Sequence, residues 1–240
     1  MRKRIESIRE GIGQNPYVSR YFGEPELRMR MKLHFGMIIN LGYGIFQMII
    51  GVLYESVWFG ALAVYYVTLS LIQGVLIVGD RGTRRIEEET KRLEKQWKTH
   101  RVCGIMLLGL NVTMSGIAIQ MIWENRGDRY PGTIIAAMAT YTFYRLTVAI
   151  IRILRKRMDI NPVLSASKAL DLSIAMMSIL ALQTAMFDAF GTDESLERLM
   201  NTLTGTGIFI LVICLALFMI VQSTILLIQG KRAKKDSKKE

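Results

Sequence analysis

Six long apolar stretches divide this sequence and limit what it can fold into. Each is close to or longer than the roughly 20 residues that a helix needs to cross about 30 Å of hydrocarbon. The stretches do not alternate between apolar and polar residues, as the strands of a membrane barrel do. The sequence therefore predicts an all-α integral membrane protein, because helices satisfy their backbone polar groups internally. The expected spans are about 34–54, 57–78, 102–123, 131–154, 163–187 and 203–229.

The basic residues lie almost entirely outside these stretches. The chain is 51% hydrophobic and has a formal net charge of +11, which is an unusual combination for a soluble domain. Twenty-six Lys and Arg residues lie in 1–33, 79–101, 152–161 and 230–240, whereas three lie in the intervening connections. Basic flanks stay on the cytoplasmic side of a membrane. This asymmetry predicts a cell-membrane protein with both termini in the cytoplasm, in contact with anionic lipids there. The charge then requires no nucleic-acid partner.

The chain divides into three parts. Residues 1–33 form a basic, amphipathic lead on the cytoplasmic side, either a helix on the membrane surface or a frayed segment. Residues 34–229 form the membrane domain. Within it, residues 84–100 carry Glu and basic residues four apart, which predicts a solvated cytoplasmic helix. Residues 230–240 are expected to be a disordered basic tail.

The spans also show weak internal similarity. The segment 108–114, LGLNVTM, aligns with 170–176, LDLSIAM, and short outer turns alternate with basic inner exits. This pattern predicts three tandem helical hairpins, arranged as a pseudo-threefold parallel repeat about an axis along the membrane normal.

Each span carries at least one polar residue, which is costly inside hydrocarbon and is therefore informative. When these residues are counted from the cytoplasmic flank of each span, they all lie roughly 12–15 Å into the membrane at 1.5 Å per residue. We therefore expect one polar layer in the cytoplasmic third. Its members are Asn40, Ser70, Asn111, Arg145, Asp171 and Gln222.

Arg145 and Asp171 are the charged centre of this predicted layer. A charge at such depth costs on the order of 3 kcal/mol, so each residue needs a partner at matching depth. Lys168 lies one turn from Asp171 and could compete for it or extend to the surface. Tyr144 and other tyrosines could line a cavity there. The sequence leaves open whether the pair binds a solute or only fixes the register of two helices.

No catalytic or metal-binding motif is present in the sequence. It lacks HExxH, GxSxG and the Walker A pattern, and its two histidines and two cysteines lack metal-ligand spacing. We therefore expect neither an enzyme nor a cofactor. The sequence favours a small-solute or ion transporter or channel that uses the polar layer. The alternative is a non-transporting scaffold or partner subunit that acts through its basic cytoplasmic face. Either would be compatible with a homo-oligomer.

Overall fold

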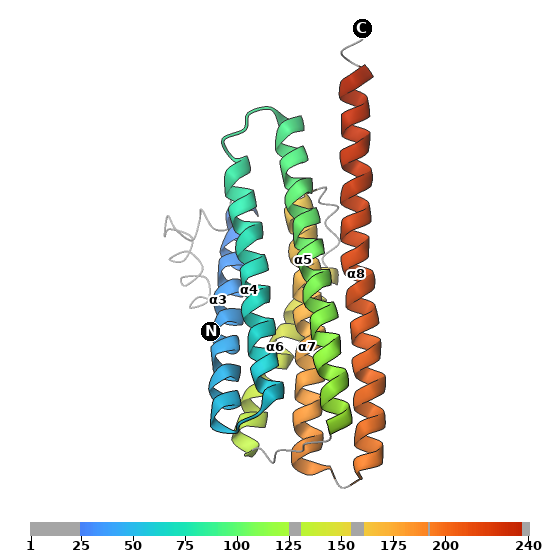
Figure 1. Ribbon diagram of the computed structural model, residues 1–240. Helices are drawn as coiled ribbons and strands as arrows, with labels where there is room; N and C mark the ends of the chain where they lie inside the picture. Colours follow the sequence, from blue (N-terminus) through green and yellow to red (C-terminus); the bar gives the residue numbers. More distant parts are fainter. Residues whose placement is uncertain (1–24, 125–130, 155–160, 192, 237–240) are drawn as a thin grey trace, which may run out of the picture.

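The structure is a computed structural model and describes residues 25–124, 131–154, 161–191 and 193–236. These residues form a bundle of long α-helices (Figure 1). Six helices are long and apolar enough to cross a membrane, which confirms the prediction of a multi-pass, all-helical membrane protein. The helices are α3 (Pro25–Leu53), α4 (Val57–Thr83), α5 (Glu89–Glu124), α6 (Gly132–Leu154), α7 (Pro162–Phe190) and α8 (Glu194–Asp236).

Helix α7 lies at the centre of the bundle and packs against α4, α5, α6 and α8. Its side chains are buried on several faces, including Leu170, Ile174 and Met177. A helix that is apolar on most of its circumference is suited to such a position. In Figure 1, α3, α4, α5 and α8 stand in one row, and α6 and α7 lie behind it. The contacts of α7 therefore connect the two groups of helices.

Helices α3 and α4 pack against each other more extensively than any other pair of the described helices. A short turn joins them, in which Glu55 adopts a φ of 51° and the Ser56 N–H donates to the Gly51 carbonyl at 2.9 Å. Gly51 also lies against the backbone of Gly60, where an added Cβ would come within 2.9 Å of the Gly60 nitrogen. Glycine is thus required for this close approach.

The expected packing of the second hairpin is wrong. Among the described residues, α5 packs chiefly against α8 and α4, whereas α6 packs chiefly against α7. Gly104 explains the first pairing, because its missing side chain lets Met219 and Ala216 of α8 approach α5 closely. The Arg145–Asp171 ion pair supports the second pairing, because it joins α6 to α7. Three hairpins with equivalent packing are therefore not the arrangement of these helices.

The helices extend further than the apolar stretches. The predicted helix 84–100 forms the first part of α5, which begins at Glu89 and continues without a break into its span. Helix α8 continues through Asp236, so residues 231–236 are helical rather than part of a disordered tail. Helix α3 begins at Pro25, and the rest of the predicted lead, residues 1–24, lies outside the described residues.

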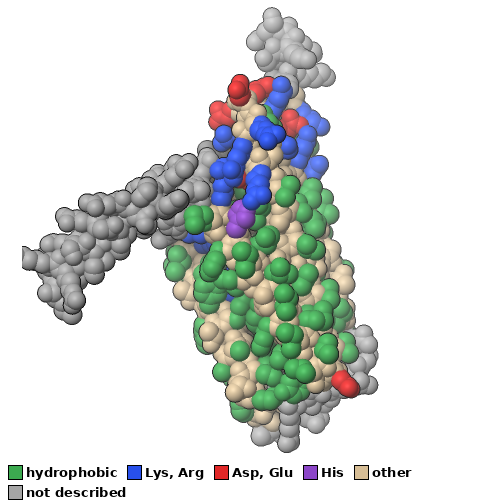
Figure 2. Space-filling model, turned by 90° about the vertical axis from the view of Figure 1, so that its left-hand side faces the viewer, with side chains coloured by type: hydrophobic (Ala, Val, Ile, Leu, Met, Phe, Trp, Pro, Cys, Tyr) green, Lys and Arg blue, Asp and Glu red, His purple; other side chains and the backbone are tan. Residues whose placement is uncertain are grey.

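Charged side chains gather at one end of the bundle, above a broad band of hydrophobic side chains (Figure 2). We call this the basic end and define it by residues 81–101 and 231–232, which hold most of the exposed Lys and Arg. The apolar band exposes large side chains such as Phe35, Ile38 and Leu71 on its outer surface. Such a surface suits contact with the hydrocarbon of a lipid bilayer.

Candidate functional site

The Arg145–Asp171 ion pair lies in the interior of the bundle, where α6 meets α7. Arg145 Nη2 donates to Asp171 Oδ1 at 3.1 Å. The two side chains are only 1% and 2% exposed. Arg145 belongs to the buried face of α6 with Met138, Thr142 and Ala149, at the spacing of one helical face. The partners predicted from equal depth are therefore in direct contact.

A second arginine, Arg152, also pairs with Asp171. Its Nη1 contacts the other carboxylate oxygen, Oδ2, and donates to Ser167 Oγ at 3.2 Å. The Arg152 side chain is 20% exposed and lies two turns closer to the basic end than Arg145. Asp171 thus bridges a fully buried guanidinium and a partly exposed one. Toward the opposite end, Thr142 Oγ1 donates to the Ser178 carbonyl at 3.1 Å and continues the polar contact between α6 and α7.

A network of neutral polar groups connects α3, α4 and α6. Asn40 Nδ2 donates to Gln73 Oε1 at 2.9 Å, and Tyr141 Oη donates to Asn40 Oδ1 at 2.9 Å. Asn40 and Gln73 are almost completely buried. Asn40 therefore belongs to a buried polar network between these helices. Its direct partners are an amide and a phenol rather than the charged pair.

Aromatic rings surround this network. Tyr43 stacks on Tyr141 with 3.5 Å between ring centroids, and Tyr66 meets both rings edge to face. Tyr141 also lies one turn before Arg145 on α6. The hydroxyls of Tyr65 and Tyr66 are buried and have no hydrogen-bond partner among the described residues. Buried hydroxyls normally have partners, so a water or a polar ligand would be favourable beside them.

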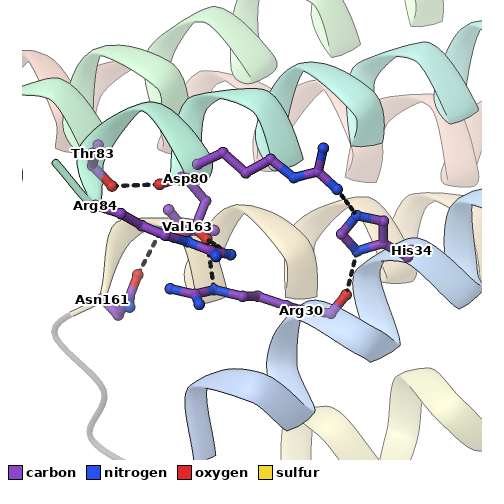
Figure 3. Close-up of polar contacts among 8 residues, drawn as sticks. Arg30, His34, Asp80, Thr83, Arg84, Asn161 and Val163 are labelled. Atoms are coloured by element: carbon purple, nitrogen blue, oxygen red, sulfur yellow. Dashed lines mark hydrogen bonds and ion pairs between the residues drawn. The ribbon is translucent and has the colours of Figure 1, made fainter.

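A second charged cluster lies at the basic end around Asp80 (Figure 3). Arg30 Nε of α3 donates to Asp80 Oδ2 at 3.0 Å, and Arg84 Nη2 lies 3.6 Å from the same oxygen. The Asp80 side chain is 7% exposed. Thr83 Oγ1 donates to the Asp80 carbonyl at 2.7 Å. This cluster joins the ends of α3 and α4 and stabilises their hairpin.

His34 extends the same cluster through both ring nitrogens. Its Nδ1 lies 2.7 Å from the Arg30 carbonyl, and its Nε2 lies 2.7 Å from Arg81 Nη2 (Figure 3). A carbonyl only accepts and a guanidinium only donates. These two contacts are hydrogen bonds when Nδ1 donates to the carbonyl and Nε2 accepts from the guanidinium.

The remaining members of the predicted layer have other partners. Ser70 Oγ donates to the Met37 carbonyl at 3.1 Å, and Asn111 Nδ2 donates to the Phe209 carbonyl of α8 at 3.0 Å. Gln222 lies 13 residues beyond Phe209 on α8, which places it about 20 Å from the depth of Asn111. Asn111 and Gln222 therefore lie at different depths, so a single layer cannot hold both of them. The count from Lys231 fails because α8 continues as a helix past that residue.

Lys168 and Tyr144 also differ from their expected positions. Among the described residues, the ion pairs of Asp171 are those with Arg145 and Arg152, so Lys168 does not take the carboxylate. Lys168 is partly exposed. Tyr144 is 39% exposed and lies on the outer surface of α6, so it does not line an interior site.

Sequence reasoning missed Arg152, Asp80 and Gln73. Arg152 was counted as a flank, although its spacing of seven residues from Arg145 places both on one face of α6. Asp80 was counted within a basic connection, because its span was expected to end near residue 78. The described residues contain no group of three or more His, Cys, Asp or Glu side chains that could hold a metal ion.

Comparisons with known proteins identify no relative of this chain. No protein-family model, no curated protein and no solved structure matches this chain. The function must therefore be inferred from the arrangement of the described side chains.

Proposed function

We propose that this protein is a transporter or channel for a small solute or ion, and that its polar site is centred on Arg145 and Asp171. One observation carries the proposal, the burial of this ion pair between two helices that are long enough to span a membrane. Charged groups at such depth are costly, and in membrane proteins they commonly mark substrate or ion pathways.

Two further features support the proposal over a purely structural pair. Arg152 links the buried pair to a partly exposed side chain nearer the basic end, which provides a polar approach. In the other direction, Tyr141 lies one turn from Arg145 and donates to Asn40, which continues the polar surroundings. A pair that only fixed helix register would not need polar neighbours on both sides.

The orientation of the protein is part of the proposal. The basic end is on the cytoplasmic side of the cell membrane, with both termini there, because 26 Lys and Arg residues flank the spans on one side and three on the other. The same residues contact anionic lipid headgroups. A homo-oligomer stays a prediction, and chemical cross-linking of the purified protein would test it.

A flux assay on purified protein in liposomes tests the transport function. The panel would contain phosphate, chloride, sodium, potassium and glycerol, and wild type would be compared with Arg145→Gln and Asp171→Asn. We expect one solute to cross faster than in empty liposomes, and both variants to slow that flux. The control is Gln229→Ala, because Gln229 is exposed near the basic end of α8. Flux that is equal to that of empty liposomes for every solute would contradict the proposal, and so would unchanged flux in both variants.

A scaffold that acts through its basic cytoplasmic face is the second candidate. The observation in its favour is that α4, α5 and α8 project beyond the apolar band (Figures 1 and 2). There, Lys91 pairs with Glu88 at 2.6 Å and Lys98 with Glu94 at 2.7 Å on the exposed surface. Reversing the charges of 84–98 would separate the candidates. A scaffold would lose its cytoplasmic interaction, whereas a transporter would keep its flux.

A further inference from the structure

Two guanidinium groups share one carboxylate where α6 meets α7. Asp171 pairs with both Arg145 and Arg152, and the described residues of α6 include no acidic side chain. The other acid of α7, Asp188, lies 17 residues further along the helix, about 25 Å away. Among the described residues, this cluster therefore retains one positive charge that no carboxylate balances.

A guanidinium group carries a positive charge in proteins. An uncompensated charge that is removed from water is strongly unfavourable unless another group pairs with it. Arg145 also has an unused donor, because its buried Nε–H has no hydrogen-bond partner among the described residues. Both the excess charge and the free N–H would be satisfied by an added anion.

The two arginine side chains of the cluster differ in their exposure to solvent. Arg145 is 1% exposed, whereas Arg152 is 20% exposed and lies nearer the basic end. An anion that approached from that end would meet Arg152 first and Arg145 second. Its approach would also be favoured by the surplus of Lys and Arg there.

We propose that Arg145 and Arg152 bind a small oxyanion, such as the carboxylate or phosphate group of a solute, while Asp171 holds both guanidinium groups in place when the anion is absent. An oxyanion suits this site better than a halide, because the planar guanidinium presents parallel N–H donors that match two oxygens at once. The inference rests on the proposed transport site and names its substrate class.

Thermal unfolding of the purified protein in detergent tests this inference. Sodium acetate and sodium phosphate are the probes, and sodium chloride at equal ionic strength is the reference. We expect a saturable rise in Tm with at least one oxyanion, beyond any effect of chloride. Arg152→Gln should abolish this rise. Arg101→Gln, which removes a partly exposed arginine of α5 near the same end, should leave it unchanged.

A second variant separates binding from a structural role. In Asp171→Asn the internal competitor for both guanidinium groups is neutral, so the oxyanion concentration at half-maximal stabilisation should fall several-fold. A cluster with only a structural role would lose stability in this variant and gain no affinity for anions. If Asp171→Asn does not fold, the inference is tested by comparing the oxyanion-dependent rise in Tm between wild type and Arg152→Gln. Equal effects of acetate, phosphate and chloride on wild type would overturn the inference, whatever Asp171→Asn shows.

Failure of this inference can be told apart from failure of the transport function. If liposomes show flux of a cation or a neutral solute that depends on Arg145, the transport function stands and the oxyanion class is wrong. If acetate or phosphate binds through Arg152 but no solute crosses the membrane, the site stands and the transport function is wrong.

Discussion

Asp171 accepts a hydrogen bond from Arg145 at 3.1 Å and contacts Arg152 through its other oxygen. The carboxylate therefore pairs with two arginines at once, and its removal would take this anionic partner from both guanidinium groups. Breaking a buried pair by removing one partner typically costs about 3–5 kcal/mol, because the other charge stays buried and unpaired.

Asp171→Leu should accordingly destabilise the protein strongly, by about 3–5 kcal/mol in thermal unfolding in detergent. The double variant Arg145→Leu with Asp171→Leu should be less destabilised than Asp171→Leu, because it leaves one unpaired arginine instead of two. The partly exposed Arg152 can extend toward the basic end in that variant. A double variant that is as unstable as the sum of both single variants would argue against direct coupling.

Exchanging the charges at positions 145 and 171 tests whether Arg152 also interacts with position 171. Arg145→Asp with Asp171→Arg places a new arginine beside Arg152, so the swap should fail to restore stability while Arg152 is present. Adding Arg152→Gln removes this repulsion, and the triple variant should be more stable than the double swap. The unfolding temperatures of the double swap and the triple variant test this prediction. Equal temperatures would show that Arg152 does not interact with position 171.

The Tyr141 hydroxyl should stabilise the packing of α6 against α3. Tyr141→Phe removes the hydrogen bond to Asn40 at 2.9 Å but keeps the ring stacked on Tyr43. We expect a loss of about 0.5–1.5 kcal/mol in unfolding free energy, the usual contribution of one hydrogen bond. Asn40→Leu should cost more, because it also leaves the buried Gln73 amide without its partner. The two changes together should cost less than their sum, and additive losses would contradict a shared network.

The six spans could be predicted because hydropathy is a local property of the sequence. The Arg145–Asp171 pair could be predicted because two charges on consecutive helices must meet at similar depth. Gln222 could not be placed in this way, since the depth of a residue depends on how far its helix projects from the membrane. Helix α8 continues to Asp236, beyond the basic residues that mark the end of the apolar stretch.

The packing of the helices depends on contacts between residues far apart in the sequence, so a weak internal repeat predicted it poorly. Gly104 of α5 meets Met219 of α8, and nothing in the local pattern around either residue indicates this partner. Arg152 was missed for a related reason. Its long side chain turns inward to Asp171, although its position near the end of α6 is typical of a residue that extends outward.

Two glycines should be sensitive to the smallest substitution. A Cβ at Gly51 would lie 2.9 Å from the Gly60 nitrogen, which belongs to rigid backbone, so Gly51→Ala should force α3 and α4 apart. The cost should be about 1–3 kcal/mol, as for other overpacked sites. Gly104→Ala should act in the same direction at the contact of α5 with α8, where Met219 Cβ would lie 3.0 Å away.

Gly42→Ala and Gly109→Ala are matched controls for these two variants, because a Cβ at either position would meet nothing within 4 Å. They lie on the same helices, α3 and α5, and should leave the unfolding temperature in detergent nearly unchanged. A control that destabilises as much as its partner would show that glycine matters there for a reason other than close packing.

The start of α8 should depend on pH through Asp193, which lies between two spans. Asp193 Oδ1 accepts hydrogen bonds from the Ser195 hydroxyl, the Ser195 N–H and the Leu196 N–H. These bonds favour the charged carboxylate and lower the pKa of Asp193 below its usual value, the Ser195 hydroxyl having the largest effect. Because the pKa is lower in the folded state, the stabilising effect is complete above the usual pKa of an aspartate. It is lost as the pH falls through the lowered pKa.

Hydrogen exchange of the Ser195 and Leu196 amides measures this effect. Their protection factors, corrected for the intrinsic pH dependence of exchange, should fall as the pH is lowered through the acid range. Asp193→Asn keeps an accepting side chain at the helix N-cap and removes the titration, so its protection should be independent of pH there. Asp193→Ala should show low protection at every pH. Protection in the wild type that did not change with pH would mean that Asp193 does not cap α8.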